Sequence, residues 1–270
     1  MPLAHLELDG RQVCVADSAA PAADAPTLVL IHGAGHDHQA WDPVAAALAA
    51  DGLRTVVPDL PGHGGSDGPA LAAVAAQAAW LLRLIDALKL SRFCLAGHSM
   101  GSLIALAAAA QAAERCIGLV LVGSVVPMPV APALLDAARD DPATAHGMIN
   151  KWSFGPVELL GETRLGELQA RNLQRMERQA AGSLAIDLGA CNAWHDGLAT
   201  AARVRCPALL LCGERDRMTP PEAAAPLLNA LRTATGDARM VQIPGAGHAL
   251  MDEAPGSVGD AMRTFAATST

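Results

Sequence analysis

One serine in this 270-residue chain lies in a pattern that suits nucleophilic catalysis. Ser99 is the centre of Gly97-His98-Ser99-Met100-Gly101, between a strand-like apolar run and a helical stretch. A turn tight enough to join the two needs small residues two positions before and two positions after the serine. Such a turn presents the hydroxyl at the N-terminus of a helix, where the helix dipole favours developing negative charge. We therefore expect Ser99 to be a nucleophile.

The base that this serine needs is expected to be His248, one of nine histidines. A serine hydroxyl is a weak nucleophile at neutral pH and must be activated by a neighbouring base. His248 follows Gly245 and Gly247 in a loop just after the last predicted strand. A histidine in a flexible loop at that position can reach the serine and take its proton.

The acid that orients the base is expected between the two in the chain, because this type of turn goes with the order nucleophile, acid, base. Glu214 and Asp216 both follow an apolar strand-like run. Asp216 is favoured because it begins a loop that leads to a helix. The end of the preceding strand has Ser124 and no carboxylate, which also favours Asp216. A surface ion pair with a neighbouring arginine is the alternative role for Asp216.

Two backbone N–H groups are expected to stabilise the negative oxygen of a tetrahedral intermediate. One belongs to Met100, directly after the nucleophile. The other is assigned to Ala34, in the loop His32-Gly33-Ala34-Gly35 that follows the apolar run 27–31. We expect His32 to hold this loop by hydrogen bonds rather than to act in catalysis.

No pattern in the sequence requires a metal or a cofactor, and we expect neither. His36, Asp37 and His38 have the ligand types for a metal, but adjacent loop residues seldom converge on one ion. A dinucleotide fingerprint fails because the third glycine after Gly33 and Gly35 is missing. The expected partner is a small-molecule substrate.

A substrate pocket is expected between Ser99 and the segment 125–202. Its candidate lining residues are His36, Met128, Trp152 and Trp194. For the methionine and the two tryptophans, plain packing between that segment and the rest of the chain is the alternative.

Strand-like and helical stretches alternate along most of the chain. The expected strands are residues 1–8, 11–16, 27–31, 55–57, 92–96, 117–122, 208–212 and 239–243. The expected helices are residues 42–50, 70–88, 100–112, about 221–231 and about 255–267. A loop rich in Ala, Pro and Asp is expected between the second and third strands. Strands that are apolar throughout are typical of a parallel sheet covered by helices on both faces.

This alternation is interrupted between about Val125 and Ala202, where helical stretches are punctuated by prolines. We therefore expect a core formed by residues 1–124 and 203–270, with a helical cap of residues 125–202 over the carboxyl edge of the sheet. The predicted fold class is α/β, a three-layer sandwich with a mostly parallel, doubly wound sheet.

The composition argues against several classes of protein. Hydrophobic residues make up 51% and charged residues 17%, which argues against disorder. A net charge of −8 without a basic cluster argues against nucleic-acid binding. The start of the chain lacks a signal peptide pattern and the longest apolar helical stretch is about half a membrane span, so we expect a cytoplasmic protein, monomeric or homodimeric. The six cysteines are expected to be buried free thiols.

Five segments together resemble the α/β-hydrolase superfamily over nearly the whole chain. They are HGAG (32–35), DLPGHGGS (59–66), GHSMG (97–101), GERDRMTP (213–220) and GAGHALMDEAP (245–255), in the order of that family. The resemblance is closest to the branch with a helical lid between the sixth and seventh core strands. That branch includes carboxylesterases, enol-lactonases, thioesterases and carbon–carbon bond hydrolases. Haloalkane dehalogenases have an aspartate nucleophile where this chain has Ser99.

The resemblance implies acyl transfer to water through Ser99, His248 and Asp216, with a small carboxylic ester, lactone or thioester as substrate. A carbon–carbon bond hydrolase of a dienoic ketone is the alternative among enzymes, because the same triad serves both. A ligand-binding member of the fold without catalytic activity is a further alternative.

Overall fold

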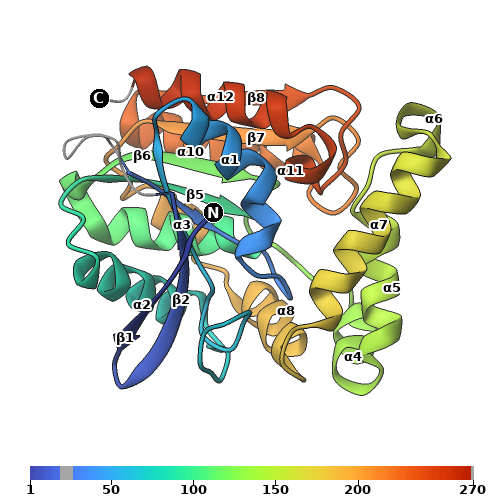
Figure 1. Cartoon of the computed structure of the whole chain (residues 1–270). Coiled ribbons are helices and arrows are strands. Elements are labelled where there is room, and N and C mark those ends of the chain that lie inside the picture. The colour runs from blue at the N-terminus through green and yellow to red at the C-terminus, as the bar shows by residue number, and fades with distance from the viewer. Residues whose placement is uncertain (19–26, 269–270) are drawn as a thin grey trace.

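The centre of the molecule is one eight-stranded sheet, in a computed structural model that describes residues 1–18 and 27–268 (Figure 1). The strands are β1 (Leu3–Leu8), β2 (Arg11–Asp17), β3 (Thr27–Ile31), β4 (Arg54–Pro58), β5 (Phe93–His98), β6 (Cys116–Val122), β7 (Ala208–Gly213) and β8 (Ala238–Ile243). Their order across the sheet is β1-β2-β4-β3-β5-β6-β7-β8. The β1–β2 and β2–β4 pairs are antiparallel and the other neighbouring pairs are parallel, so the predicted mostly parallel sheet is confirmed.

Helices cover both faces of the sheet. On one face lie α1 (Asp42–Ala50), α11 (Leu250–Glu253) and α12 (Pro255–Thr268). On the other lie α2 (Val74–Ala87), α3 (Met100–Ala112), α9 (Gly197–Ala201) and α10 (Ala225–Thr235). Figure 1 shows α1 and α12 above the sheet and α2 and α3 below it. Short 3-10 helices are η1 (His38–Trp41), η2 (Ala113–Arg115) and η3 (Pro221–Ala224).

Strand β3 shows why the central strands are apolar along their whole length. Leu28 and Leu30 belong to the hydrophobic cluster between the sheet and helices α1 and α12. Val29 and Ile31 belong to the cluster on the opposite face, between the sheet and helices α2 and α3. Successive side chains of a strand point to opposite faces of the sheet. Because helices cover both faces, all five residues of β3 are buried, and the strand reads as a continuous apolar run.

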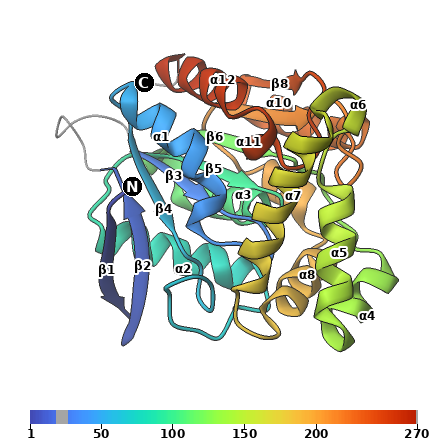
Figure 2. The ribbon, with the colours of Figure 1, turned by 45° about the vertical axis from the view of Figure 1, so that its right-hand side comes forward.

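The segment between β6 and β7 contains helices and no strand over residues 123–207, all of which the structure describes. Before α9 these helices are α4 (Pro132–Asp140), α5 (Pro142–Trp152), α6 (Val157–Leu160), α7 (Glu162–Glu177) and α8 (Ser183–Ala193), together called the helical insertion here. Side chains of α4, α5, α7 and α8 form a hydrophobic cluster of their own. Figure 2 shows α4, α5 and α7 beside the sheet. Helix α9 instead packs against α3 and α10 of the core.

One predicted helix begins later than expected. Helix α2 starts at Val74 rather than at residue 70, because Ala73 is extended, with φ −143 and ψ 135. The carbonyl oxygen of Leu71 accepts a hydrogen bond from the Gln77 side chain at 2.8 Å. The loop predicted between β2 and β3 falls on residues 19–26, outside the described residues.

Two further findings concern the whole chain. All six cysteines are buried and free, as predicted. Within residues 1–18 and 27–268, no helix combines the length and the apolar character that a membrane crossing requires.

The backbone is tightly constrained at the turn between β5 and α3. Ser99 has φ 52 and ψ −120, a conformation that residues with a β-carbon rarely adopt. A β-carbon on Gly97 would overlap the backbone of Gly101, and one on Gly101 would overlap the carbonyl oxygen of Ile31 in β3. Both obstacles are backbone atoms, so both positions require glycine.

Substitution of Gly101 tests this constraint. Gly101→Ala is expected to lower the free energy of unfolding by at least about 3 kcal/mol, because the methyl group collides with a buried strand that cannot move aside. Gly166→Ala is the control, since a β-carbon there meets nothing within 4 Å and alanine favours a helix interior by about 0.5–1 kcal/mol. Urea unfolding followed by circular dichroism measures the free energy of unfolding of both variants. Gly101→Ala with the stability of wild type would contradict the prediction.

Candidate active site

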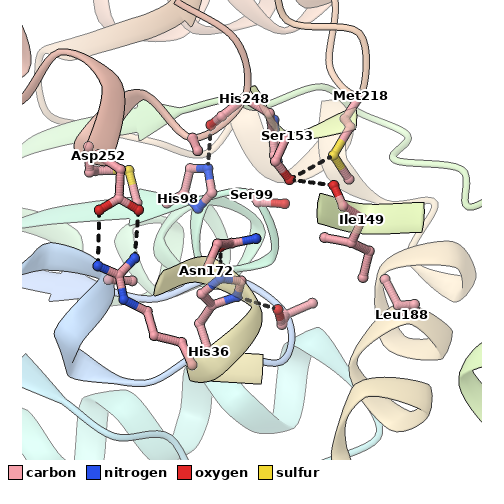
Figure 3. A pocket seen from close by; sticks show the side chains of 16 residues that line it. His36, His98, Ser99, Ile149, Ser153, Asn172, Leu188, Met218, His248 and Asp252 are labelled. Carbon is pink, nitrogen blue, oxygen red and sulfur yellow. Dashed lines mark hydrogen bonds and ion pairs between the residues drawn. The ribbon is translucent and has the colours of Figure 1, made fainter. Parts of the chain in front are cut away.

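Ser99, His248 and Asp216 come together where three parallel strands end. Ser99 directly follows β5, Asp216 follows β7, and His248 lies in the loop after β8. Ser99 and His248 line the same two cavities, and Figure 3 shows them in the lining of one of these. The Nδ1 atom of His248 lies 2.8 Å from Oδ2 of Asp216. The structure thus assembles the three residues that the sequence singled out.

Asp216 is buried, and its carboxylate accepts hydrogen bonds at both oxygens. Oδ1 accepts from the backbone N–H groups of Met218 at 2.8 Å and Thr219 at 2.9 Å, and Oδ2 accepts from the Thr219 hydroxyl at 2.6 Å. Burial by itself raises the pKa of Asp216, but the His248 charge and these hydrogen bonds lower it to about 2. An ionised carboxylate accepts the Nδ1–H of His248, which leaves Nε2 available as a base.

Glu214, the other carboxylate considered for this role, faces a different group. Its Oε2 accepts the N–H of Gly245 at 2.8 Å, and its Oε1 lies 3.6 Å from the Arg215 guanidinium. Arg217 donates to the carbonyl oxygen of Lys151. The neighbouring arginines therefore have partners other than Asp216. At the end of β6, the Ser124 hydroxyl accepts from Ser102 at 2.7 Å.

His98, directly before Ser99, ties the turn to the His248 loop. Its Nε2–H donates to the backbone carbonyl oxygen of His248 at 2.9 Å, and the two rings lie 4.7 Å apart between centroids. Burial, followed by the nearby His248, lowers the pKa of His98 well below its usual value. The ring is therefore neutral. No sequence pattern predicted a role for His98.

The loop that contains Ala34 is held in the way expected of His32. The Nδ1–H of His32 donates to the carbonyl oxygen of Gly33 at 2.9 Å, and its Nε2 accepts the N–H of Leu60 at 3.1 Å. Burial lowers the pKa of His32 to about 4, so that Nε2 stays free to accept. Ala34 lines both cavities beside Ser99, and Met100 is the fully buried first residue of α3.

A buried carboxylate of the helical insertion also holds this loop. Oδ2 of Asp187, in α8, accepts the N–H of Gly35 at 2.8 Å and lies 2.9 Å from Nε2 of His63. Burial alone would lower the pKa of His63, but the charge and hydrogen bond of Asp187 raise it. The insertion is thus bound to the loop of Ala34 by buried hydrogen bonds.

The residues considered for a metal do not share one site. Nε2 of His36 lies 2.8 Å from Oδ1 of Asn172. Asp37 caps η1 by accepting the N–H of Gln39 at 3.0 Å. His38 faces Asp59 instead, with 2.8 Å between Nδ1 and Oδ1. The three side chains therefore diverge.

One other group has ligand atoms within 4.8 Å of one another, namely Cys14, His38 and Asp59. The two carboxylate oxygens of Asp59 already accept the N–H of His38 at 2.7 Å and the N–H of Gly65 at 2.8 Å. Burial and the nearby Asp59 charge raise the pKa of Cys14 to about 11, which keeps the thiol protonated. Metal binding requires the thiolate, so this group fits an anchor for the loop 59–66 better than a metal site.

Two cavities of different size open from Ser99. The wide cavity has a volume of about 210 Å³ and the narrow cavity one of about 50 Å³. Of the predicted pocket residues, Met128 and Trp152 line the wide cavity and His36 lines the narrow one. Trp194 lines neither of the two, and its half-buried side chain packs against the core beneath α2 and α3.

An ion pair at the narrow cavity was not predicted from the sequence. Arg175 of α7 donates two hydrogen bonds to the carboxylate of Asp252, at 2.6 and 2.9 Å. Both residues line the narrow cavity, and both side chains are less than a tenth exposed. The two residues are 77 positions apart, so no local pattern could have shown that they pair.

Glu253 was missed as well, although it belongs to the segment GAGHALMDEAP that carries the resemblance. Its Oε1 accepts the N–H of Gly247 at 2.9 Å and its Oε2 accepts the N–H of Gly155 at 2.7 Å. The N–H of Ala249 donates to the carbonyl oxygen of Ser153 at 2.8 Å. Burial raises the pKa of Glu253. Its place five residues after the histidine in a family segment was the available signal.

Comparison with known proteins places these observations in a family context. A family model described as "Alpha/beta hydrolase family" matches residues 28–261. The chain is 30% identical over 244 residues to a pimeloyl-[acyl-carrier protein] methyl ester esterase of Aromatoleum aromaticum, which covers 83% of this chain and 91% of the relative. It is 29% identical over 202 residues to a 2-succinyl-6-hydroxy-2,4-cyclohexadiene-1-carboxylate synthase of Salmonella schwarzengrund, covering 71% and 78%.

Solved structures share the fold. The enol-lactonase from Burkholderia xenovorans LB400 superposes with a TM-score of 0.85 at 24% identity, over 97% of this chain and 99% of the other.

The low pKa of Asp216 predicts a pH dependence of stability. A carboxyl group with a pKa of about 2 in the folded state, against 3.8 ordinarily, stabilises the fold above pH 4 by about 2 kcal/mol. This contribution is lost as the pH falls from 4 through 2. The stability difference between wild type and Asp216→Asn should therefore shrink by about that amount between pH 5 and pH 2. Urea titrations at the two pH values measure this stability difference, and Glu158→Gln on α6 is the control. A difference between wild type and Asp216→Asn that stays constant with pH would contradict the prediction.

Proposed function

The chain belongs to the alpha/beta hydrolase family, and on this premise we propose that it hydrolyses a small carboxylic ester, lactone or thioester through an acyl-enzyme. The observation that carries the proposal is the position of Ser99. Its strained turn places it beside the hydrogen-bonded pair of His248 and Asp216, where two cavities meet. The esterase among the relatives supports the same reaction class.

In this mechanism Ser99 Oγ attacks the carbonyl carbon while Nε2 of His248 takes the hydroxyl proton. The resulting imidazolium is stabilised by the ionised Asp216, which also keeps Nδ1 protonated. His248 then gives its proton to the leaving alcohol or thiol as the bond to the carbonyl carbon breaks. A water molecule, deprotonated by His248, then attacks the carbonyl carbon of the acyl-enzyme. As the bond to Ser99 Oγ breaks, His248 returns that proton to Oγ, and the carboxylic acid leaves.

The N–H groups of Met100 and Ala34 are the proposed donors to the tetrahedral oxyanion. Met100 opens the thirteen-residue helix α3, whose N-terminus favours negative charge. Ala34 belongs to a loop that His32 and Asp187 hold by buried hydrogen bonds. Donors that are already fixed need no reorganisation when the charge develops, which is the source of their catalytic effect.

We also propose that residues 125–202 act as a cap over a core of residues 1–124 and 203–270. Side chains from α5, α7 and α8 line the narrow cavity opposite Ser99, and the insertion has a hydrophobic cluster of its own. Helix α9 packs on the core, so the part that covers the site ends with α8. The cap would exclude water and select the substrate.

Substitution of Ser99 tests the proposal. Ser99→Ala is expected to keep the melting temperature and to lose at least about a thousandfold in hydrolysis of p-nitrophenyl acetate. A fluorophosphonate should label wild type at Ser99, as located by peptide mass spectrometry, and should leave the variant unlabelled. Ser257→Ala, at an exposed position of α12, should behave as wild type.

Three outcomes would contradict this assignment. Full activity of Ser99→Ala would remove Ser99 from the mechanism. Absence of both labelling and hydrolysis in wild type would favour a ligand-binding protein without catalysis. Cleavage of a 2-hydroxy-6-oxo-dienoate, without cleavage of any ester, would favour carbon–carbon bond hydrolysis.

A further inference from the structure

The two cavities at Ser99 impose a shape on any ester that reacts there. An ester has one substituent on each side of its carboxyl group, and both need space when the carbonyl carbon lies against Ser99 Oγ. The cavities both include Ala34, Ser99 and His248 in their linings, so they meet at the proposed reaction centre. One has about 210 Å³ and the other about 50 Å³. A substrate with one large and one small substituent uses this space fully.

The lining of the wide cavity is apolar away from the reaction centre. Its apolar side chains come mainly from α4, α5, α8 and the segment before α4: Met128, Val130, Leu134, Trp152, Leu188 and Cys191. Arg217, the charged residue of this lining, is exposed and donates to the carbonyl oxygen of Lys151. An alkyl chain in this cavity gains about threefold to fourfold in binding for each buried methylene group.

The narrow cavity has one ion pair in its lining, between Arg175 and Asp252. The two-point contact of Arg175 with Asp252 neutralises the guanidinium, and His36 is bonded to Asn172. Figure 3 shows Asp252, His36 and Asn172 around this cavity with their interactions drawn. A substrate carboxylate would compete with Asp252 for the same guanidinium, so that two buried carboxylates would share one positive charge, which is unfavourable. The cavity is therefore suited to a small neutral group.

We propose that the substrates are neutral esters with one extended apolar substituent and one short substituent, such as a methyl or acetyl group. This inference rests on the proposed ester hydrolysis and adds the substrate class. Val130, Leu134 and Trp152 set the length of the long substituent, and the Arg175–Asp252 pair restricts the short substituent to small uncharged groups.

Three isomeric esters of similar hydrophobicity test this expected substrate shape. Hexyl acetate and methyl heptanoate each have one long and one short side, whereas butyl butanoate has two sides of nearly equal length. The better of the first two is expected to exceed butyl butanoate at least tenfold in kcat/KM. Hexyl acetate should also exceed the anion of monohexyl malonate at least tenfold, because the malonate carries its charge on the short side.

A variant that fills the wide cavity identifies which cavity takes the long side. Val130→Trp should lower the ratio of kcat/KM for hexyl acetate over methyl acetate at least tenfold. Ala131→Trp, at an exposed position of the same lining, serves the same purpose if the first variant does not fold. Leu198→Trp on α9, which is 41% exposed, is the control and should keep the wild-type ratio.

The outcomes separate this inference from the proposed function. Preference for butyl butanoate or for the malonate, similar rates for all esters, or an unchanged ratio in both cavity variants would overturn the substrate class while ester hydrolysis stands. Labelling of Ser99 by the fluorophosphonate without hydrolysis of any of the isomers would overturn it too. Among the results of these ester assays, the absence of both labelling and hydrolysis is the one that would overturn the proposed function.

An independent observation concerns Glu253, which joins the His248 loop to the helical insertion. Its carboxylate bridges the N–H groups of Gly247 and Gly155, and the residue is 5% exposed. On the other side of the histidine, Ala249 is bonded to Ser153. Both neighbours of His248 are therefore fastened to the segment 153–155. Glu253 itself lines neither cavity.

We infer that Glu253 is a positioning residue, which fixes His248 through Gly247 against the insertion. A carboxylate can accept both N–H groups, whereas the amide of glutamine offers one oxygen and turns N–H donors toward the second N–H group. Loss of this buried contact would let the base leave the position from which it reaches Ser99.

Measured well below the melting temperature, Glu253→Gln is expected to lower kcat for p-nitrophenyl acetate at least tenfold and to change KM less than threefold. The rate of fluorophosphonate labelling should fall at least tenfold as well. Glu253→Asp should show a smaller loss and decides the question if the first variant does not fold. Glu214→Gln, which removes a carboxylate that accepts from the same loop at its exposed end, should stay within twofold of wild type. A lower melting temperature with unchanged kcat and labelling would show a purely structural role and overturn the inference.

Discussion

The arrangement of this site depends on the close backbone contact at the turn between β5 and α3. Ser99 is held in a left-handed conformation because Gly97 and Gly101 let the strand, the helix and β3 approach without intervening β-carbons. This contact directs the hydroxyl away from the sheet and places the start of α3 beneath it. A residue in such a conformation persists only when its surroundings hold it there. The surrounding strands and α3 are among the most deeply buried parts of the molecule.

Around this rigid point, the helical insertion is attached to both loops on which catalysis would depend. Asp187 holds the loop of Ala34 through Gly35, and Glu253 holds the loop of His248 against Gly155. These contacts are buried, and a buried charge that loses its partners is strongly destabilising. The insertion therefore does more than line the cavities. Its position and the positions of the proposed base and oxyanion donor are fixed together.

The sequence by itself determined which residues form the proposed reaction centre and which layers surround it. The glycines about Ser99 are a local requirement of one turn, and the loop of His248 is marked by local glycines as well, so both can be read without the rest of the chain. The continuous apolar strands indicated a sheet covered on both faces, and β3 shows why, since alternate residues such as Leu28 and Val29 face different helices. Helix α2 begins later than the sequence predicted, and the carbonyl oxygen of Leu71 accepts a hydrogen bond from the Gln77 side chain there.

Only the tertiary structure decided what surrounds Ser99. Arg175 pairs with a carboxylate 77 positions away, and Asp187 reaches Gly35 across 152 positions. A helical pattern shows that a side chain is polar or apolar but not which distant group it meets, and Trp194 illustrates this by packing on the core instead of lining a cavity. The ion pair beside the narrow cavity arises from such a distant pairing. How a bond is cut is therefore a local property of this sequence, whereas which bond is cut is a property of the folded chain.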